Sequence, residues 1–466
     1  MFKSHENKSG ICISGTRHVL ILCVVLIAFS AAFYKVYHRP SVALFQVPVS
    51  FPRESEQKKS APMTSNAVLS FRTHFASTQQ NISTHAASLV ELSGGRIRAF
   101  WFAGSREGSE DVEIRSAVFD PAKNSWGPEH SIANREDTQR ALLRYVKKLG
   151  NPVAQRAADG TLWLFYVTVS LGGWAGSSIT AITSKDDGAS WSPARRLITS
   201  PFINISTLVK GTPFMYSDGT MGLPVYHEFI GKFGELLRIN SSGEIVDKQR
   251  LSSGKSTLQP VILIKNPQQA LVLMRRSGTS PKRVIATATD DAGQHWSVPM
   301  NTMLANPDAA ITGMALLDGK ILLALNNIEE GRDALSLVIS ADGGNTWKTI
   351  YQLEDQRTQP TALAHYVQAT SELARVTEES ITDATGYAKS AQQNKCDAQI
   401  LSPGSGQDCA FEFSYPYLIQ AHNGDFHLVY TWNRSFIKHV QFTHAWLDQR
   451  IEKINDMEKS GHATLH

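Results

Sequence analysis

The chain has 466 residues, of which 42% are hydrophobic, and a formal net charge of +4. This length and apolar content are enough to bury a sizeable core, in one large domain or in two smaller ones. Because the positive charge is small and no basic stripe is interleaved with aromatic residues, we do not expect nucleic acid as a partner. The small positive charge is compatible with an anionic substrate.

The N-terminus carries a targeting signal. A short tail of residues 1–18 contains Lys3, Lys8 and Arg17, and residues 19–34 form an apolar stretch without charge. We expect this stretch to be a membrane signal anchor, with a cleaved signal peptide as the alternative and a secreted protein as its consequence. Residues 35–65, rich in Pro, Ser, Lys and Glu, are expected to form a linker.

Three segments share the pattern S/T-x-D-x-G-x-x-W, called an Asp box: Ser184–Trp191, Thr289–Trp296 and Ser340–Trp347. The Asp side chain can accept backbone N–H bonds across a tight turn, the Gly permits positive φ, and the Trp fills the apolar layer beneath. We therefore expect Asp186, Asp291 and Asp342 to be structural residues.

Six units, each a turn followed by an apolar strand, recur along the chain: Ser93–Phe102, Asp159–Tyr166, Asp218–Tyr226, Pro267–Arg275, Asp318–Leu325 and Asn423–Tyr430. Repeats of this length predict an all-β, six-bladed β-propeller over residues 66–446, with the apolar strand of each unit innermost. Residues at about 352–411 are expected to form an insertion, which is either solvent-exposed or covers one face of the propeller or mediates an oligomer contact. Residues 447–466 are expected to form a polar tail.

Cys396 and Cys409 are the two cysteines outside the N-terminal region. We expect them to form a disulfide, which requires an oxidising compartment and places the propeller outside the cytoplasm; two unpaired thiols are the alternative. No Cys or His set has metal-ligand spacing, and the glycine-rich loop 172–178 lacks the Gly-Lys-Ser/Thr of a phosphate loop. Neither a metal, a cofactor nor a nucleotide is expected.

Together with the boxes and the six units, four phrases make the chain similar to the sialidase (neuraminidase) superfamily over about residues 82–443. The phrases are Trp101–Gly108, Gly150–Val153, Leu223–Tyr226 and Ser414–Ile419. Within the superfamily it most resembles bacterial predicted neuraminidases with Asp-box repeats. The resemblance implies an Asp acid/base, a Tyr nucleophile assisted by a Glu, and three Arg that bind a substrate carboxylate.

The resemblance implies an acid/base and a nucleophile among the residues of this chain. Asp111 follows Arg106 in the loop of the first unit, and this pair matches the acid/base Asp and an Arg of the family. Glu107 is the rival acid. Tyr415 matches the nucleophile. The alternatives are that the carboxylates are solvated loop residues and that the Tyr only packs.

The chain also departs from the family. Gln259 stands where the family has the Glu that assists the Tyr, although Arg275 follows it as a family Arg does. Because an amide cannot take a proton, Glu228, with Asp308 behind it, is the expected substitute, and generic surface carboxylates are the alternative.

The carboxylate clamp is incomplete in the sequence. His85 lies near the position of the first family Arg, and unit five ends in Asn326-Asn327 without an Arg. Arg434 is expected to supply a cation from unit six. Other side chains expected at the central mouth are Asn151, Trp174, Lys210, Trp432, Lys438 and His439.

These residues predict a sialidase-like exo-glycosidase that removes a terminal, acidic sugar from a glycan by general acid/base catalysis. Two alternatives stay open: a propeller that binds glycans or assembles without catalysis, and a glycosidase or lyase for another acidic sugar such as a uronate.

Overall fold

The computed structural model describes residues 11–37, 42–47, 69–79, 82–200, 204–278, 280–357 and 412–460. The chain divides into two units, Met1–Val42 and Ala43–His466. In the first unit, helix α1 (Ile11–Tyr37) extends beyond the expected apolar stretch on both sides. Its part Gly15–Tyr34 is long and apolar enough to cross a membrane, a test that a signal sequence also passes.

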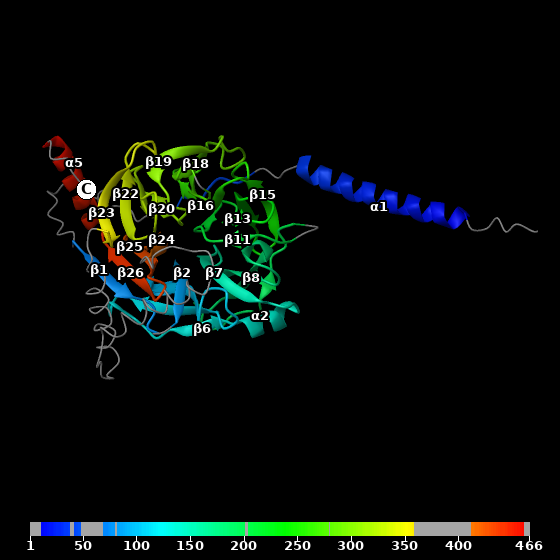
Figure 1. The fold of residues 1–466 in the computed structure, drawn as a ribbon, viewed down its shortest axis with the longest axis horizontal. Helices are drawn as coiled ribbons and strands as arrows, with labels where there is room; N and C mark the ends of the chain where they lie inside the picture. Colours follow the sequence, from blue (N-terminus) through cyan, green and yellow to red (C-terminus); the bar gives the residue numbers. More distant parts are fainter. Residues whose placement is uncertain are drawn as a thin grey trace, which may run out of the picture. The chain divides into compact units, whose positions relative to one another are not determined.

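The second unit is a six-bladed β-propeller (Figure 1). Blade one contains β2 (Ser83–Glu91), β3 (Ile97–Gly104) and β4 (Glu113–Asp120), with β5 (Ser125–Trp126) and β6 (His130–Ala133) both paired to β4. Blade two contains β7 (Lys148–Arg156), β8 (Leu162–Val169), β9 (Ser177–Ser184) and β10 (Arg195–Arg196). Blade three contains β11 (Leu208–Val209), β12 (Phe214–Met215), β13 (Met221–His227), β14 (Phe233–Ile239) and β15 (Ile245–Arg250).

The remaining blades follow the same antiparallel order. Blade four contains β16 (Thr257–Ile264), β17 (Ala270–Arg276), β18 (Arg283–Thr289) and β19 (Met300–Ala305). Blade five contains β20 (Thr312–Ala315), β21 (Ile321–Leu325), β22 (Ala334–Ser340) and β23 (Lys348–Asp355). Blade six contains β24 (Phe413–Gln420), β25 (Phe426–Trp432), β26 (Phe436–Phe442) and β1 (Phe71–Phe75), so a strand that precedes blade one closes the ring.

The order of strands within a blade corrects one sequence expectation. The apolar strand after each turn, such as β3 or β8, is the second strand of its sheet and not the innermost one. The first strands line the axis, because β2 lies against β7 and β24, and β20 lies against β16 and β24. The second strands are the most apolar because sheets of neighbouring blades cover them on both faces.

The three Asp boxes connect the third and fourth strands of blades two, four and five and share one geometry. The hydroxyl that begins each box accepts the Gly N–H, at 2.8 Å in the first box, and the Asp accepts the N–H four residues later, at 2.9 Å in all three. Hydrogen bonds from Ser184 and Ser190 hold the pKa of Asp186 well below its usual range. These bonds fit a structural role for Asp186, Asp291 and Asp342.

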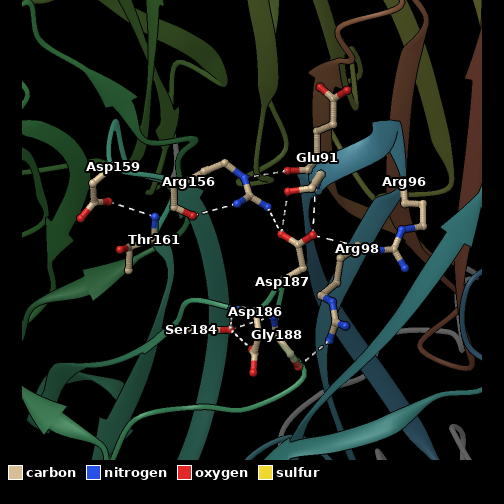
Figure 2. Close-up of polar contacts among 12 residues, drawn as sticks. Glu91, Arg96, Arg98, Arg156, Asp159, Thr161, Ser184, Asp186, Asp187 and Gly188 are labelled. Carbon is tan, nitrogen blue, oxygen red and sulfur yellow. Dashed lines mark hydrogen bonds and ion pairs between the residues drawn. The ribbon is translucent and has the colours of Figure 1, made fainter.

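The first box also joins blade two to blade one through Asp187 (Figure 2). Its carboxylate accepts hydrogen bonds from Ser93 N at 3.2 Å and Ser93 Oγ at 3.3 Å, and from the guanidinium of Arg156. Arg156 in turn donates to the Glu91 carbonyl at 3.4 Å. Burial raises the pKa of Asp187, but the bonds and charge of Arg156 and Ser93 outweigh burial and lower it overall.

We expect Asp187→Ala to lower the free energy of unfolding by about 2 kcal/mol, because hydrogen bonds to a charged group are lost. Chemical denaturation at pH 7 measures this, with Asp456→Ala as control, since Asp456 forms an exposed pair with Lys459. The folded pKa of Asp187 is depressed, so the stabilisation is present at neutral pH and disappears as the pH falls through that pKa. An equal loss in both variants would contradict the assignment.

Part of the expected linker packs on the propeller. Phe45 is 2% exposed and lies against Phe214 and Tyr216, with ring centroids 5.6 Å and 5.5 Å away. Its N–H donates to the Pro267 carbonyl at 2.9 Å. The propeller unit therefore includes residues well before position 66.

The expected polar tail also differs from the structure. Residues from His444 to Lys459 form helix α5, which buries Trp446 and Leu447. Trp446 packs against Phe71 of β1, with ring centroids 4.6 Å apart. Cys396, Cys409 and residues 358–411 of the insertion lie outside the described residues.

Two buried histidines lie in blade six where it meets blade one. His427 Nδ1 and His439 Nε2 are 3.0 Å apart, and Trp126 Nε1 donates to His439 Nδ1 at 3.3 Å. Both imidazoles are buried, so His439 does not line the mouth as expected. Burial and then the charge of His74 lower the pKa of His427 to about 4.

We expect the free energy of unfolding to fall as the pH is lowered from about 6.5 to about 4, by up to about 3 kcal/mol for His427 alone. The folded pKa lies below the unfolded one, so the unfolded chain binds more protons in this window and acid favours unfolding. Denaturation curves at pH 7 and pH 4.5 test this against His427→Asn. A pH dependence unchanged in the variant would show that other groups cause it.

Candidate functional site

The candidate site begins with a backbone feature repeated in every blade. One non-glycine residue in or just before each first strand has positive φ, between 45° and 59°: Ala86, Asn151, Ser206, Gln259, Asp308 and Tyr415. The strand register shifts at these points in β2, β7, β16 and β24. Such conformations are strained and are retained where surrounding structure fixes them, commonly at functional sites.

These kinks lie at one end of the propeller. Each first strand pairs antiparallel with the second strand, and its kink is opposite the end of that strand, as His85 is opposite Phe102. The loops that join second and third strands emerge at this end, which we call the mouth. The Asp boxes join third and fourth strands and therefore lie at the opposite end.

Tyr415 is the centre of a hydrogen-bond network at the mouth. Its hydroxyl oxygen accepts hydrogen bonds from Arg275 Nη1 at 3.3 Å and from Gln259 Nε2 at 3.4 Å. Arg275 Nη1 also donates to Gln259 Oε1 at 3.1 Å. Three residues singled out in the sequence, from blades four and six, are thus brought together.

Tyr226 extends the network to blade two and was not identified as a site residue from the sequence. Asn151 Nδ2 donates to its hydroxyl at 3.1 Å, and Gln259 Nε2 lies 3.4 Å away. Burial raises the pKa of Tyr226 above its usual value, so it stays protonated. Its place at the end of the phrase Leu223–Tyr226 was the available signal.

Arginine side chains from three blades surround the network. Arg275 Nε contacts Asp308 Oδ1 at 2.5 Å, and Arg434 contacts Glu107 at 2.6 Å and Glu412 at 2.9 Å. Arg332, in the loop between β21 and β22, donates to the Asp308 carbonyl at 2.7 Å. The apolar strand of unit five is followed by Asn326-Asn327 without an Arg, and blade five instead brings Arg332 to the mouth from the loop that follows.

His85 lies behind Tyr415 and does not face the mouth as a ligand-binding residue. It is 1% exposed, and its ring meets that of Tyr415 edge-on, with centroids 4.4 Å apart. Burial, followed by the charges of Arg434, Arg332, Lys210 and Arg275, holds its pKa well below its usual value. His85 therefore stays neutral and supports the Tyr415 ring within a positively charged environment.

Lys210 lies at the same depth. It is 3% exposed, its Nζ donates to the Ala87 carbonyl at 3.3 Å, and it lies 5.7 Å from the ring centroid of Tyr415. Burial lowers its pKa to about 7. Among the described residues no carboxylate forms an ion pair with it.

Glu228 begins the loop between β13 and β14. Its N–H donates to Ser206 Oγ, at the kink of blade three, at 2.8 Å. Burial raises the pKa of Glu228, against the lowering effect of Lys232 and Arg275. It is the carboxyl group at the mouth best suited to hold a proton at mildly acidic pH.

Asp111 and Arg106 lie in the loop in which they were expected, whereas Trp432 does not reach the mouth. Asp111 and Arg106 lie exposed on the first mouth loop, where Asp111 accepts hydrogen bonds from Ser105 N and Oγ at 2.8 Å and 2.9 Å. Trp432 is 1% exposed and packs in the core near Phe413 and Phe436, so its side chain is not available to a ligand. Trp432 is the last residue of β25, and its position in the chain is at the mouth end although its side chain points into the core.

The family model for the BNR repeat-like domain matches residues 95–428, and the chain belongs to this family of sialidase-like BNR repeat proteins. No curated protein matches the sequence.

Solved structures share the fold at low identity. The Hadza microbial sialidase Hz136 is 14% identical with a TM-score of 0.55, over 78% of this chain and 66% of that one, just under two thirds of its length. The NanB sialidase of Streptococcus pneumoniae, as a K499G mutant, is 10% identical with a TM-score of 0.55, over 84% and 72%. The intramolecular trans-sialidase of Ruminococcus gnavus, with oseltamivir carboxylate, is 12% identical with a TM-score of 0.54, over 80% and 97%.

Proposed function

We propose that the propeller is an exo-glycosidase that releases a terminal acidic sugar, of the sialic acid type, from glycans. One observation carries this proposal: the Tyr415 hydroxyl oxygen accepts N–H bonds from Arg275 and Gln259, and the half-buried Arg332 and Arg434 and the buried Lys210 lie around it. Such a site favours negative charge on its ligand and on groups that react with it.

The carboxylate of the sugar would bind the guanidinium groups at the mouth. Arg275, Arg332 and Arg434 come from blades four, five and six, and planar guanidinium groups bind a carboxylate through paired hydrogen bonds. Asp308, Glu107 and Glu412 already orient these groups. The site would therefore be preorganised before substrate binds.

Glu228 would carry the proton. Its carboxyl group gives a proton to the glycosidic oxygen as the bond to the anomeric carbon breaks, and the attacking water returns a proton to the Glu228 carboxylate. Tyr415 would offer its oxygen to the positive charge on the anomeric carbon. Within the part of the chain that the structure describes, no carboxylate, Glu228 and Asp308 included, forms a hydrogen bond with the Tyr415 hydroxyl, so the proposal does not use Tyr415 as the attacking group.

The full-length protein in detergent, incubated with aryl glycosides of sialic acid, uronic acids and neutral sugars, tests the proposal. We expect release of an acidic sugar that is greatly reduced in Arg332→Met, with Asp111→Ala assayed in parallel. Release of a uronic acid alone would show that the substrate carries a uronic acid and not a sialic acid. Glycan binding without turnover of any glycoside would overturn the proposal that the protein is an enzyme and would support a propeller that only binds glycans.

We also propose that α1 is an uncleaved signal anchor and that the propeller lies outside the cytoplasm. The length and apolar composition of Gly15–Tyr34 support a membrane helix. Protease added to cells with an opened outer envelope and an intact cytoplasmic membrane should degrade the propeller, whereas protection until that membrane is lysed would contradict this orientation.

A further inference from the structure

A pocket beside the candidate site has no role in the chemistry described above. It has a volume of about 420 Å³ and lies at the mouth end of blade three, where β13 ends, β14 begins and β15 ends. Its lining includes His227, Phe233, Glu235, Lys248, Arg250 and Ile230.

The pocket combines a flat aromatic wall with charge. The rings of His227 and Phe233 are stacked, 4.7 Å apart and 7° from parallel, and the guanidinium of Arg250 lies 3.7 Å from the Phe233 centroid. Glu235, 6% exposed, pairs with Lys248 at 3.1 Å. Arg250 is exposed and forms no ion pair within the part of the chain described, so the pocket has one positive charge without a counterion.

The pocket adjoins the proposed proton carrier. His227, the last residue of β13, lines the pocket, and Glu228 directly follows it. The charges of Arg275, Asp308 and Lys148 act on the Glu228 carboxyl, which therefore lies toward the mouth. In the loop between β13 and β14, the Phe229 side chain is 58% exposed and that of Ile230 is 85% exposed. The exposed Ile230 beside the hydroxyls of Ser200 and Ser253 suits a sugar ring, which has both apolar faces and polar edges.

We propose that this pocket binds the second sugar of the substrate, the one released as the leaving group, and that this sugar carries an acidic group held by Arg250. The inference rests on the proposed function, because it places the leaving-group side next to Glu228. The substrate class is then a glycan with acidic groups on two successive sugars.

Two natural glycans test whether the leaving-group sugar must be acidic. Disialic acid has an acidic leaving-group sugar, and sialyl-lactose has a neutral one. We expect kcat/KM of the full-length protein in detergent to be higher for disialic acid, and Arg250→Gln to lower it about tenfold for disialic acid while sparing sialyl-lactose. Equal effects on both substrates, or no preference in the unchanged protein, would overturn the proposal.

Arg195→Gln is the matched control. Arg195 makes the same kind of contact, 4.9 Å from the Trp163 centroid, but at the end opposite the mouth, so neither substrate should be affected. If neither substrate is hydrolysed, the proposed function fails, and binding of disialic acid is measured by NMR titration. Binding weakened by Arg250→Gln would then still support the pocket, whereas binding that is absent or unchanged in the variant would overturn it.

Discussion

Replacing Glu228 with Gln is expected to lower kcat about 10³-fold on natural glycans, because a positioned general acid contributes on the order of 10²- to 10⁴-fold. Gln has the same shape and can form the same backbone contact to Ser206, so stability should not change. Burial raises the pKa of Glu228 above its usual value of 4.5. Activity of the unchanged protein should therefore fall as the pH rises through this raised pKa, where the acid loses its proton.

An aryl glycoside provides the internal control for this variant. Its leaving group departs without protonation, so Glu228→Gln should lose less than about tenfold on it. Glu107→Gln and Asp111→Asn are assayed beside it. If Asp111→Asn alone shows the large loss on natural glycans and the small loss on the aryl glycoside, the proton carrier is Asp111, as the sequence comparison suggested.

Replacing Tyr415 with Phe is expected to lower kcat by about 10²- to 10³-fold, the usual cost of removing one preorganised electrostatic group. Phe keeps the ring contact with His85 and removes only the oxygen that accepts hydrogen bonds from Arg275 and Gln259. Initial rates at saturating substrate measure the effect.

The matched control is Tyr417→Phe, two residues further along β24. Tyr417 is buried on the strand next to the site, and we expect full activity within about threefold if the Tyr415 oxygen itself matters. A similar loss in both variants would indicate a general disturbance of β24 and would remove Tyr415 from the proposed chemistry.

Much of the site could be predicted because its signals are local. The sequence singled out Asn151, Gln259 and Tyr415 as site residues, and the structure finds them at the mouth, each at positive φ in a first strand. The pairing of Gln259 with Arg275 was also accessible, since both lie on adjacent strands of one hairpin. Arg332 was missed because a loop side chain reaches its place only when neighbouring blades are assembled. Tyr226 was missed because, within its own apolar strand, nothing shows that Asn151 and Gln259 of other blades meet its hydroxyl.

The sequence by itself determined the repeat architecture and the Asp boxes, because turns and apolar strands act over a few neighbouring residues. Only the tertiary structure decided which strand lines the axis, that Trp432 and His439 are buried and that Arg332 completes the set of cations. Burial and the distances between charges depend on contacts between residues far apart in the chain, as Arg434 with Glu107 shows. The ring closure of six blades is what brings these residues together.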